Sequence, residues 1–106
     1  MVMQIDWSKR ALRELDIVIG QCEAQFGIRV ALHFYQTLTD WEVHLSDNPS
    51  LGFPEPLLVD RNRNYRSLLI HAHFKLVYYI AKDAIKIADL WDTRRDPEKL
   101  KKRIKK

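Results

Sequence analysis

The sequence predicts an α+β domain in which a helical hairpin covers one face of an antiparallel sheet. Two observations support this. Residues 9–26 and 28–45 show the three- and four-residue apolar spacing of amphipathic helices. Three β-rich runs follow at 65–70, 74–80 and 84–91, with only three residues between consecutive runs. Breaks this short require antiparallel neighbours, because a parallel crossover needs about a dozen residues.

Local signals predict an N-terminal strand and the first helix. Residues 2–7 are rich in β-branched and aromatic side chains and favour an edge strand. Ser8 suits the N-cap of the helix, and Gly27 suits the residue that ends it. We expect the apolar face of this helix at Leu12, Leu15, Ile19, Cys22 and Phe26.

The second helix is expected directly after Gly27 and is stopped by Asp47-Asn48-Pro49. Two amphipathic helices joined so tightly favour an antiparallel hairpin. The apolar stripe of the second helix is expected at Ala31, Phe34 or Tyr35, Leu38, Trp41 and Leu45.

Alternation along the central run, 74–80, defines two faces of the sheet. The first face is apolar and holds Phe74, Leu76, Tyr78 and Ile80. The second face is mixed and holds Lys75, Val77 and Tyr79. We therefore expect the helical hairpin on the apolar face, and we expect the mixed face to be open and to be the working surface.

The chain's 106 residues suffice for a single domain with its own core, which we place at 1–98 and follow with a basic tail at 99–106. No apolar run approaches the roughly 20 residues that span a bilayer. The N-terminus lacks a signal-peptide pattern, and the lone Cys22 cannot form an internal disulfide. These features predict a cytoplasmic protein without a membrane partner.

Charge is distributed unevenly along the chain. Residues 1–60 carry four basic and nine acidic side chains, whereas residues 61–106 carry fourteen basic and five acidic ones. Such a basic half predicts a polyanionic partner, with RNA or DNA the first candidates. The alternative is a solubilising tail, since six of the last eight residues are Lys or Arg. Outside that tail, arginines still cluster at Arg61, Arg63, Arg66, Arg94 and Arg95.

Four segments together resemble one group of bacterial proteins. They are GFPEPL at 52–57, NYRSLLI at 64–70, FKLVYYI at 74–80 and LWDTRRDPEKL at 90–100. In this order and spacing they resemble the RelE/ParE superfamily of toxins from type II toxin–antitoxin pairs, and the first is similar to a loop of its YoeB branch. The resemblance covers nearly the whole chain. It implies a RelE-like fold and an antitoxin partner in a hetero-oligomer.

The superfamily contains two activities. RelE-like and YoeB-like members cut mRNA in the ribosomal A site, using the RNA 2′-hydroxyl as nucleophile and neither metal nor cofactor. ParE-like members instead poison DNA gyrase. The resemblance makes an mRNA endoribonuclease that inhibits translation our first expectation, in a plasmid-stabilisation type of system. A gyrase inhibitor without nuclease activity and a degenerate member that only binds its antitoxin are the alternatives.

Cleavage through the 2′-oxygen needs a base, cationic groups around the phosphate and an acid for the leaving oxygen. By resemblance to the PEPL loop, Glu55 is the candidate base, and Arg66 and Arg95 are the candidate catalytic cations. The candidate phosphate-binding residues are Arg61, Arg63, Lys75 and Arg94. In the simpler readings, Glu55 is an exposed loop carboxylate and Lys75 is a solvated lysine. The arginines then form surface ion pairs with Asp89 or Asp92.

One departure from the nuclease pattern concerns the general acid. Nuclease members end in a histidine or tyrosine where this chain has Thr93 and Arg94, and no His or Tyr follows Tyr79. Arginine does not readily release a proton. Tyr79 or His73 is the available substitute. The residues alone therefore leave open whether the protein is a nuclease or a gyrase inhibitor.

Overall fold

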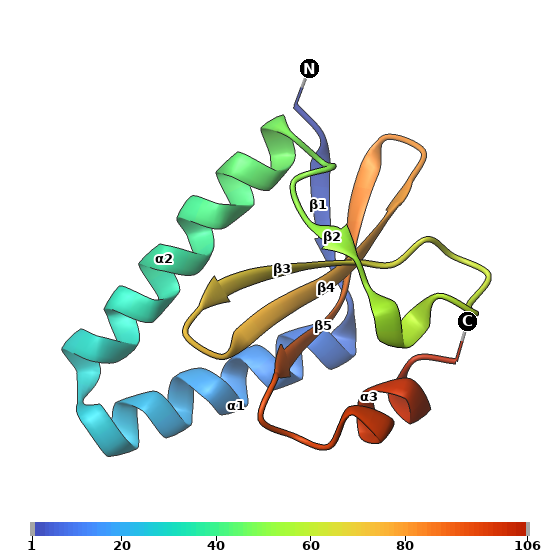
Figure 1. Ribbon diagram of the computed structural model, residues 1–106. Coiled ribbons are helices and arrows are strands. Elements are labelled where there is room, and N and C mark those ends of the chain that lie inside the picture. The colour runs from blue at the N-terminus through green and yellow to red at the C-terminus, as the bar shows by residue number, and fades with distance from the viewer. Residues whose placement is uncertain (1, 106) are drawn as a thin grey trace.

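The computed structural model describes residues 2–105. Its helices and strands follow in the order β1 (Gln4–Trp7), α1 (Lys9–Phe26), α2 (Ile28–Asp47), β2 (Phe53–Pro54), the short 3₁₀ helix η1 (Pro56–Leu58), β3 (Arg66–His71), β4 (Phe74–Ala81), β5 (Ala84–Asp92) and α3 (Pro97–Arg103). The strands form one sheet in the order β1-β5-β4-β3-β2, beside a splayed hairpin of α1 and α2 (Figure 1). The predicted α+β class is confirmed. No helix within 2–105 is long and apolar enough to cross a bilayer.

The sheet is mixed rather than purely antiparallel. β3, β4 and β5 pair antiparallel through two tight turns, as their short breaks predict. β1 is an edge strand, also as predicted, but it runs parallel to β5, with Gln4 opposite Ala84 and Trp7 opposite Ile87. The long stretch of chain between these two strands makes the parallel pairing feasible.

The main core lies between the α1–α2 hairpin and the first face of the sheet. On α2 the predicted stripe is confirmed, and Phe34, not Tyr35, is the buried aromatic. On α1 the predicted face is only partly confirmed. Leu15 and Ile19 pack against the core as predicted, together with Ala11 and Val18. Leu12 and Phe26 are 46% and 63% exposed, because the buried face is rotated away from them.

The second face of the sheet is covered, and the prediction of an open face is wrong. Val77 and Trp91 are fully buried there. Their cover comes from η1 and α3, which lie side by side (Figure 1), and its buried side chains are Leu58, Tyr65, Leu100 and Ile104. Leu100 and Ile104, the two apolar side chains of the basic tail, are four residues apart, and their burial holds residues 100–104 against the sheet.

A bulge in β5 directs one acidic side chain into this second core. Val77 pairs with Asp89 and Tyr78 pairs with Ile87, so Ala88 is an extra residue on β5. The shift places both Ala88 and Asp89 on the second face. Asp89 is consequently fully buried next to α3.

Candidate functional site

The Glu55 carboxylate is buried and fully engaged. The residue is 2% exposed. Its Oε1 accepts hydrogen bonds from Ser67 Oγ at 2.6 Å and from Lys75 Nζ, and its Oε2 accepts from the Leu57 amide at 3.0 Å. The last bond caps η1, which begins at Pro56. The simpler reading of Glu55 as an exposed loop carboxylate is therefore wrong.

These contacts also set the proton affinity of Glu55. Burial acts to raise the pKa of the carboxyl, but the hydrogen bonds from Lys75, Ser67 and Leu57 outweigh burial and lower it. A general base works best with a pKa near the operating pH. A carboxylate whose pKa is lowered and whose oxygens are already bonded is poorly suited to take a proton from a hydroxyl.

Arg66 lies on the other side of the sheet from Glu55. It pairs with Tyr78, which belongs to the main core, whereas Ser67 and Lys75 point to the second face. Its guanidinium holds the loop before β2: Nε and Nη2 donate to the Gly52 carbonyl at 3.1 and 2.8 Å, and Nη2 also donates to the Ser50 carbonyl. Arg66 and Glu55, which a shared nuclease site would bring together, thus lie on opposite faces of the sheet.

Arg61 has a structural contact instead of an open phosphate site. Its Nε donates to the Ile104 carbonyl and its Nη2 to the Lys101 carbonyl, both at 2.7 Å. These are carbonyls at the C-terminal end of α3, which have no further helical turn to accept from. The side chain is only 14% exposed. Arg61 thus fastens α3 to the loop after η1.

Arg94 and Arg95 follow β5, as predicted, but they contact different partners. Arg94 forms a two-bond pair with Asp92 at 2.9 and 3.1 Å, and 68% of its side chain is exposed. Arg95 stacks 4.5 Å from the Trp91 ring centre and lies 3.9 Å from Glu14. The pairing of an arginine with Asp92 agrees with the simpler surface-pair reading.

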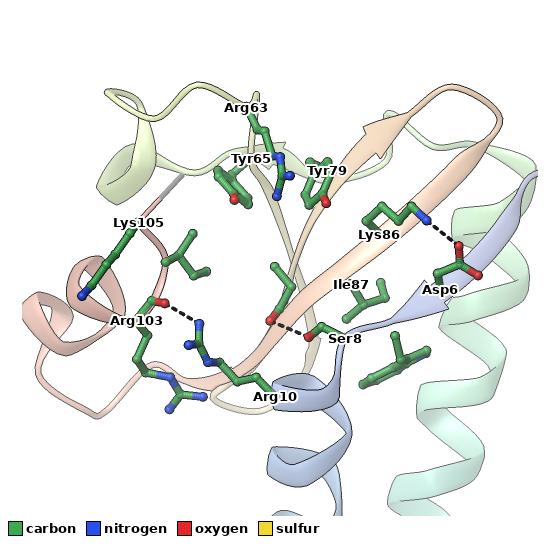
Figure 2. A pocket seen from close by; sticks show the side chains of 13 residues that line it. Asp6, Ser8, Arg10, Arg63, Tyr65, Tyr79, Lys86, Ile87, Arg103 and Lys105 are labelled. Atoms are coloured by element: carbon green, nitrogen blue, oxygen red, sulfur yellow. Dashed lines mark hydrogen bonds and ion pairs between the residues drawn. The ribbon is translucent and has the colours of Figure 1, made fainter.

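The two substitute proton donors lie at opposite ends of β4. Arg63 covers the ring of one of them, Tyr79, at 4.3 Å from the ring centre (Figure 2). His73 stacks against Phe74 at the β3–β4 turn, next to the other end of β4. Of the seven predicted site residues, only Glu55 and Lys75 are in direct contact.

The sequence analysis missed a buried ionic cluster under α3. Arg103 donates to Asp89 at 2.7 Å and lies 3.1 Å from Glu14. Burial raises the pKa of Asp89 to about 6, with Arg103 opposing the rise and Glu14 adding to it. The sequence held only a weak signal for this cluster. Asp89 is an acid within an otherwise apolar strand, and Arg103 belongs to a basic tail whose composition suggests solvent exposure.

A family model covers most of this structure. It is described as the ParE toxin of the type II toxin–antitoxin system parDE, and it matches residues 5–97. This chain belongs to the ParE toxin family. The resemblance to the RelE/ParE superfamily is thereby confirmed.

Solved structures of ParE-like and YoeB-like proteins share the fold. A chain in the chromosomal ParDE toxin–antitoxin system from P. aeruginosa is 22% identical with a TM-score of 0.69, covering 84% of this chain and 94% of that one. The YoeB dimer from Staphylococcus aureus gives 20% identity and a TM-score of 0.55, with the same coverage. No curated protein sequence matches this ParE-family chain.

Proposed function

We propose that this ParE-family toxin acts by binding and inhibiting a protein target, with DNA gyrase as the expected target, and not by cutting mRNA. The observation that carries the proposal is the state of Glu55. Its carboxylate is buried, its oxygens accept three hydrogen bonds, and its pKa is lowered. The residue that the nuclease reading needs as base is thus part of the structural framework.

Two further features support a non-nuclease toxin. Arg66 is on the opposite face and bonded to loop carbonyls, so it is not aimed at a phosphate near Glu55. Thr93 and Arg94 occupy the place of the general acid, and neither releases a proton readily at neutral pH. Base, phosphate cations and acid would each have to rearrange before cleavage.

The nuclease remains the second candidate because of one contact. Glu55 and Lys75 come from separate motifs of the YoeB-like pattern, and they meet as an ion pair. A ribosome that displaced η1 or α3 would expose this pair. That requirement for displacement is why we rank the nuclease below the gyrase inhibitor.

We also propose an antitoxin as the binding partner of this toxin in the cytoplasm. The helical hairpin offers it a surface, since large apolar side chains on α1 and α2 are exposed; they are Leu12, Ile17, Phe26, Ile28, Val30, Leu32, Tyr35 and Val43. So much exposed apolar surface is typical of a protein-binding face. The basic C-terminal half would attract an acidic antitoxin segment.

The test combines induced expression with two assays of the purified toxin. We expect growth arrest, a block of gyrase-dependent supercoiling, and intact mRNA in a translating extract. Glu55→Gln, checked for folding by thermal unfolding, should still block supercoiling. Codon-specific mRNA cuts that disappear in Glu55→Gln would establish the nuclease instead. An absence of growth arrest would indicate a protein that only binds its antitoxin.

A further inference from the structure

A cavity of about 440 Å³ is lined by neither Glu55 nor Lys75, although Arg63 borders it (Figure 2). It is bounded by the end of β1 and the start of α1, by β4 and β5, and by the last residues of α3 and the segment that follows. This volume is within the range of small-molecule sites, roughly 300–1,000 Å³. The inference below is independent of the proposed function.

The walls of this cavity are strongly cationic. One acid, Asp6, faces five basic side chains: Arg10, Arg63, Lys86, Arg103 and Lys105. Lys86 pairs with Asp6, and Arg103 pairs with Asp89 and Glu14. Within residues 2–105, neither Arg10 nor Arg63 forms an ion pair with a carboxylate, although the charge of Arg10 acts on Asp89 and opposes the rise of its pKa. The basic side chains at the cavity outnumber the three carboxylates that they contact or influence, which are Asp6, Glu14 and Asp89.

Tyr65 is a buried residue that brings its hydroxyl to the cavity. The residue is only 4% exposed, and its ring meets Tyr79 edge-on at 5.4 Å. Its hydroxyl points toward the cavity between Arg63 and Arg10 (Figure 2), and it makes no hydrogen bond to any residue that the structure describes. The hydroxyl oxygen is not among the buried polar atoms without a partner, so it is accessible from the cavity and can donate to an acceptor bound there.

The arginines beside Tyr65 are held in place by their contacts. Arg63 stacks 4.3 Å from the Tyr79 ring centre, and its guanidinium is directed between the two tyrosines (Figure 2). Arg10 donates from Nη1 to the Arg103 carbonyl, which ties it to the C-terminal wall. Arg10 also lies in the first turn of α1, an 18-residue helix whose N-terminal end favours anions.

We propose that this cavity binds the phosphate group of a nucleotide-sized ligand. Two arginines that form no ion pair and a tyrosine hydroxyl line it from different elements, which matches the several acceptor oxygens and the charge of a phosphate. The face of Tyr79 is already covered by Arg63, so the site recognises the phosphate rather than stacking a base. A free nucleotide and the end of a nucleic-acid strand both carry this group.

The experiment is an NMR titration of the full-length isotope-labelled protein. The probes are inorganic phosphate, a 5′-mononucleotide, and a short single-stranded RNA with and without a 5′-phosphate. We expect saturable shifts at Tyr65, Tyr79 and the start of α1. A nucleotide that binds more tightly than inorganic phosphate identifies a free nucleotide as the source. An RNA that binds only with its 5′-phosphate identifies a strand end.

Matched variants separate this site from general attraction to a basic protein. Arg63→Gln should weaken binding about tenfold, the usual effect of one charge-assisted hydrogen bond. Tyr65→Phe, which removes only the hydroxyl, should weaken it roughly threefold. Arg29→Gln, an equal charge loss on an exposed part of α2, should change it by less than about twofold. Unsaturable shifts with every probe, or equal losses in Arg63→Gln and Arg29→Gln, would overturn the proposal.

Discussion

Lys75 and Glu55 form an ion pair inside the protein, where their side chains are 17% and 1% exposed. The pair joins β4 to the residue that precedes η1, and Ser67 completes it from β3. Two strands and the covering loop are thus connected at one carboxylate. This contact makes Glu55 a structural residue and gives the first prediction.

Replacing Lys75 by Met should destabilise the fold by about 3 kcal/mol, because a buried carboxylate would lose its charge partner. Lys86→Met is the matched control, since the Lys86–Asp6 pair is 39% and 37% exposed and its loss should destabilise the fold far less. Denaturant unfolding measures both. Adding Glu55→Gln to Lys75→Met should recover part of the loss. Equal losses in the two lysine variants would contradict an internal role for this pair.

Asp89 should make the stability of the fold depend on pH. Its pKa is raised to about 6 because it is buried, and its Oδ2 has no hydrogen-bond partner within the described residues. The folded state therefore holds this proton more tightly than the unfolded chain, whose carboxyl titrates near pH 4. Protonation of Asp89 favours folding below about pH 4, and this contribution is lost as the pH rises through 6.

We therefore expect the free energy of unfolding of the wild type to decrease as the pH rises from about 4 to 7. This decrease should be about 3 kcal/mol larger than in Asp89→Asn, which lacks the titrating carboxyl. The lowered pKa of Glu55 acts in the opposite direction, and it acts only as the pH drops below the usual range of a glutamate. Denaturant unfolding at a series of pH values measures the difference. Two parallel curves, offset but equal in slope, would show that Asp89 does not titrate in this window.

Arg61→Gln should loosen α3 without unfolding the domain. The variant loses the two hydrogen bonds to the Lys101 and Ile104 carbonyls, each worth about 1.5–3 kcal/mol when the donor is charged. Hydrogen exchange at residues 97–105 should accelerate roughly tenfold or more while exchange in β4 changes less. Arg94→Gln, which alters a pair at the exposed end of β5, is the control and should leave exchange in α3 unchanged.

Gly52→Ala should be destabilising by about 1–3 kcal/mol, because an added Cβ would lie 2.6 Å from the Ser67 carbonyl oxygen and 2.8 Å from the Tyr78 hydroxyl. The Tyr78 hydroxyl accepts a hydrogen bond from the Gly52 amide and donates one to the Pro49 carbonyl, so it cannot move away from the new Cβ without losing these bonds. Gly20→Ala, in the middle of α1 with no atom within 4 Å of the new Cβ, should instead stabilise by about 0.5–1 kcal/mol. The midpoint temperature of thermal unfolding should therefore fall in Gly52→Ala and rise in Gly20→Ala.

Much of the fold was predictable because it follows local rules. The hairpins β3–β4 and β4–β5 follow from breaks of three residues, and the ends of α1 follow from Ser8 and Gly27. The placement of Arg66 was also available in the sequence. Arg66 is separated from Leu68 and Ile70 by two and four residues, so the two-residue period of a strand places all three side chains on the apolar face. The match of Arg66 to a family motif favoured a phosphate-binding position on the open face instead, and the strand period gave the correct face.

The residues that cover the second face were not predictable in the same way. Leu100 and Ile104 are two apolar side chains in a run of lysines, which is too short a pattern to indicate burial. Their burial depends on Trp91 and Leu58, which belong to distant segments. Asp89 likewise became a buried acid through a β-bulge, and a bulge depends on pairing with the neighbouring strand.

The sequence by itself determined the α+β class, the order of the elements and the membership of a toxin superfamily, because each rests on patterns within a few residues or on motifs in order. Only the tertiary structure decided which of the motif residues meet. Glu55 and Lys75 meet, Arg66 lies across the sheet from them, and Arg61 holds α3. Such contacts depend on strand register and on what covers each face, and both are set by long-range packing that no local spacing encodes.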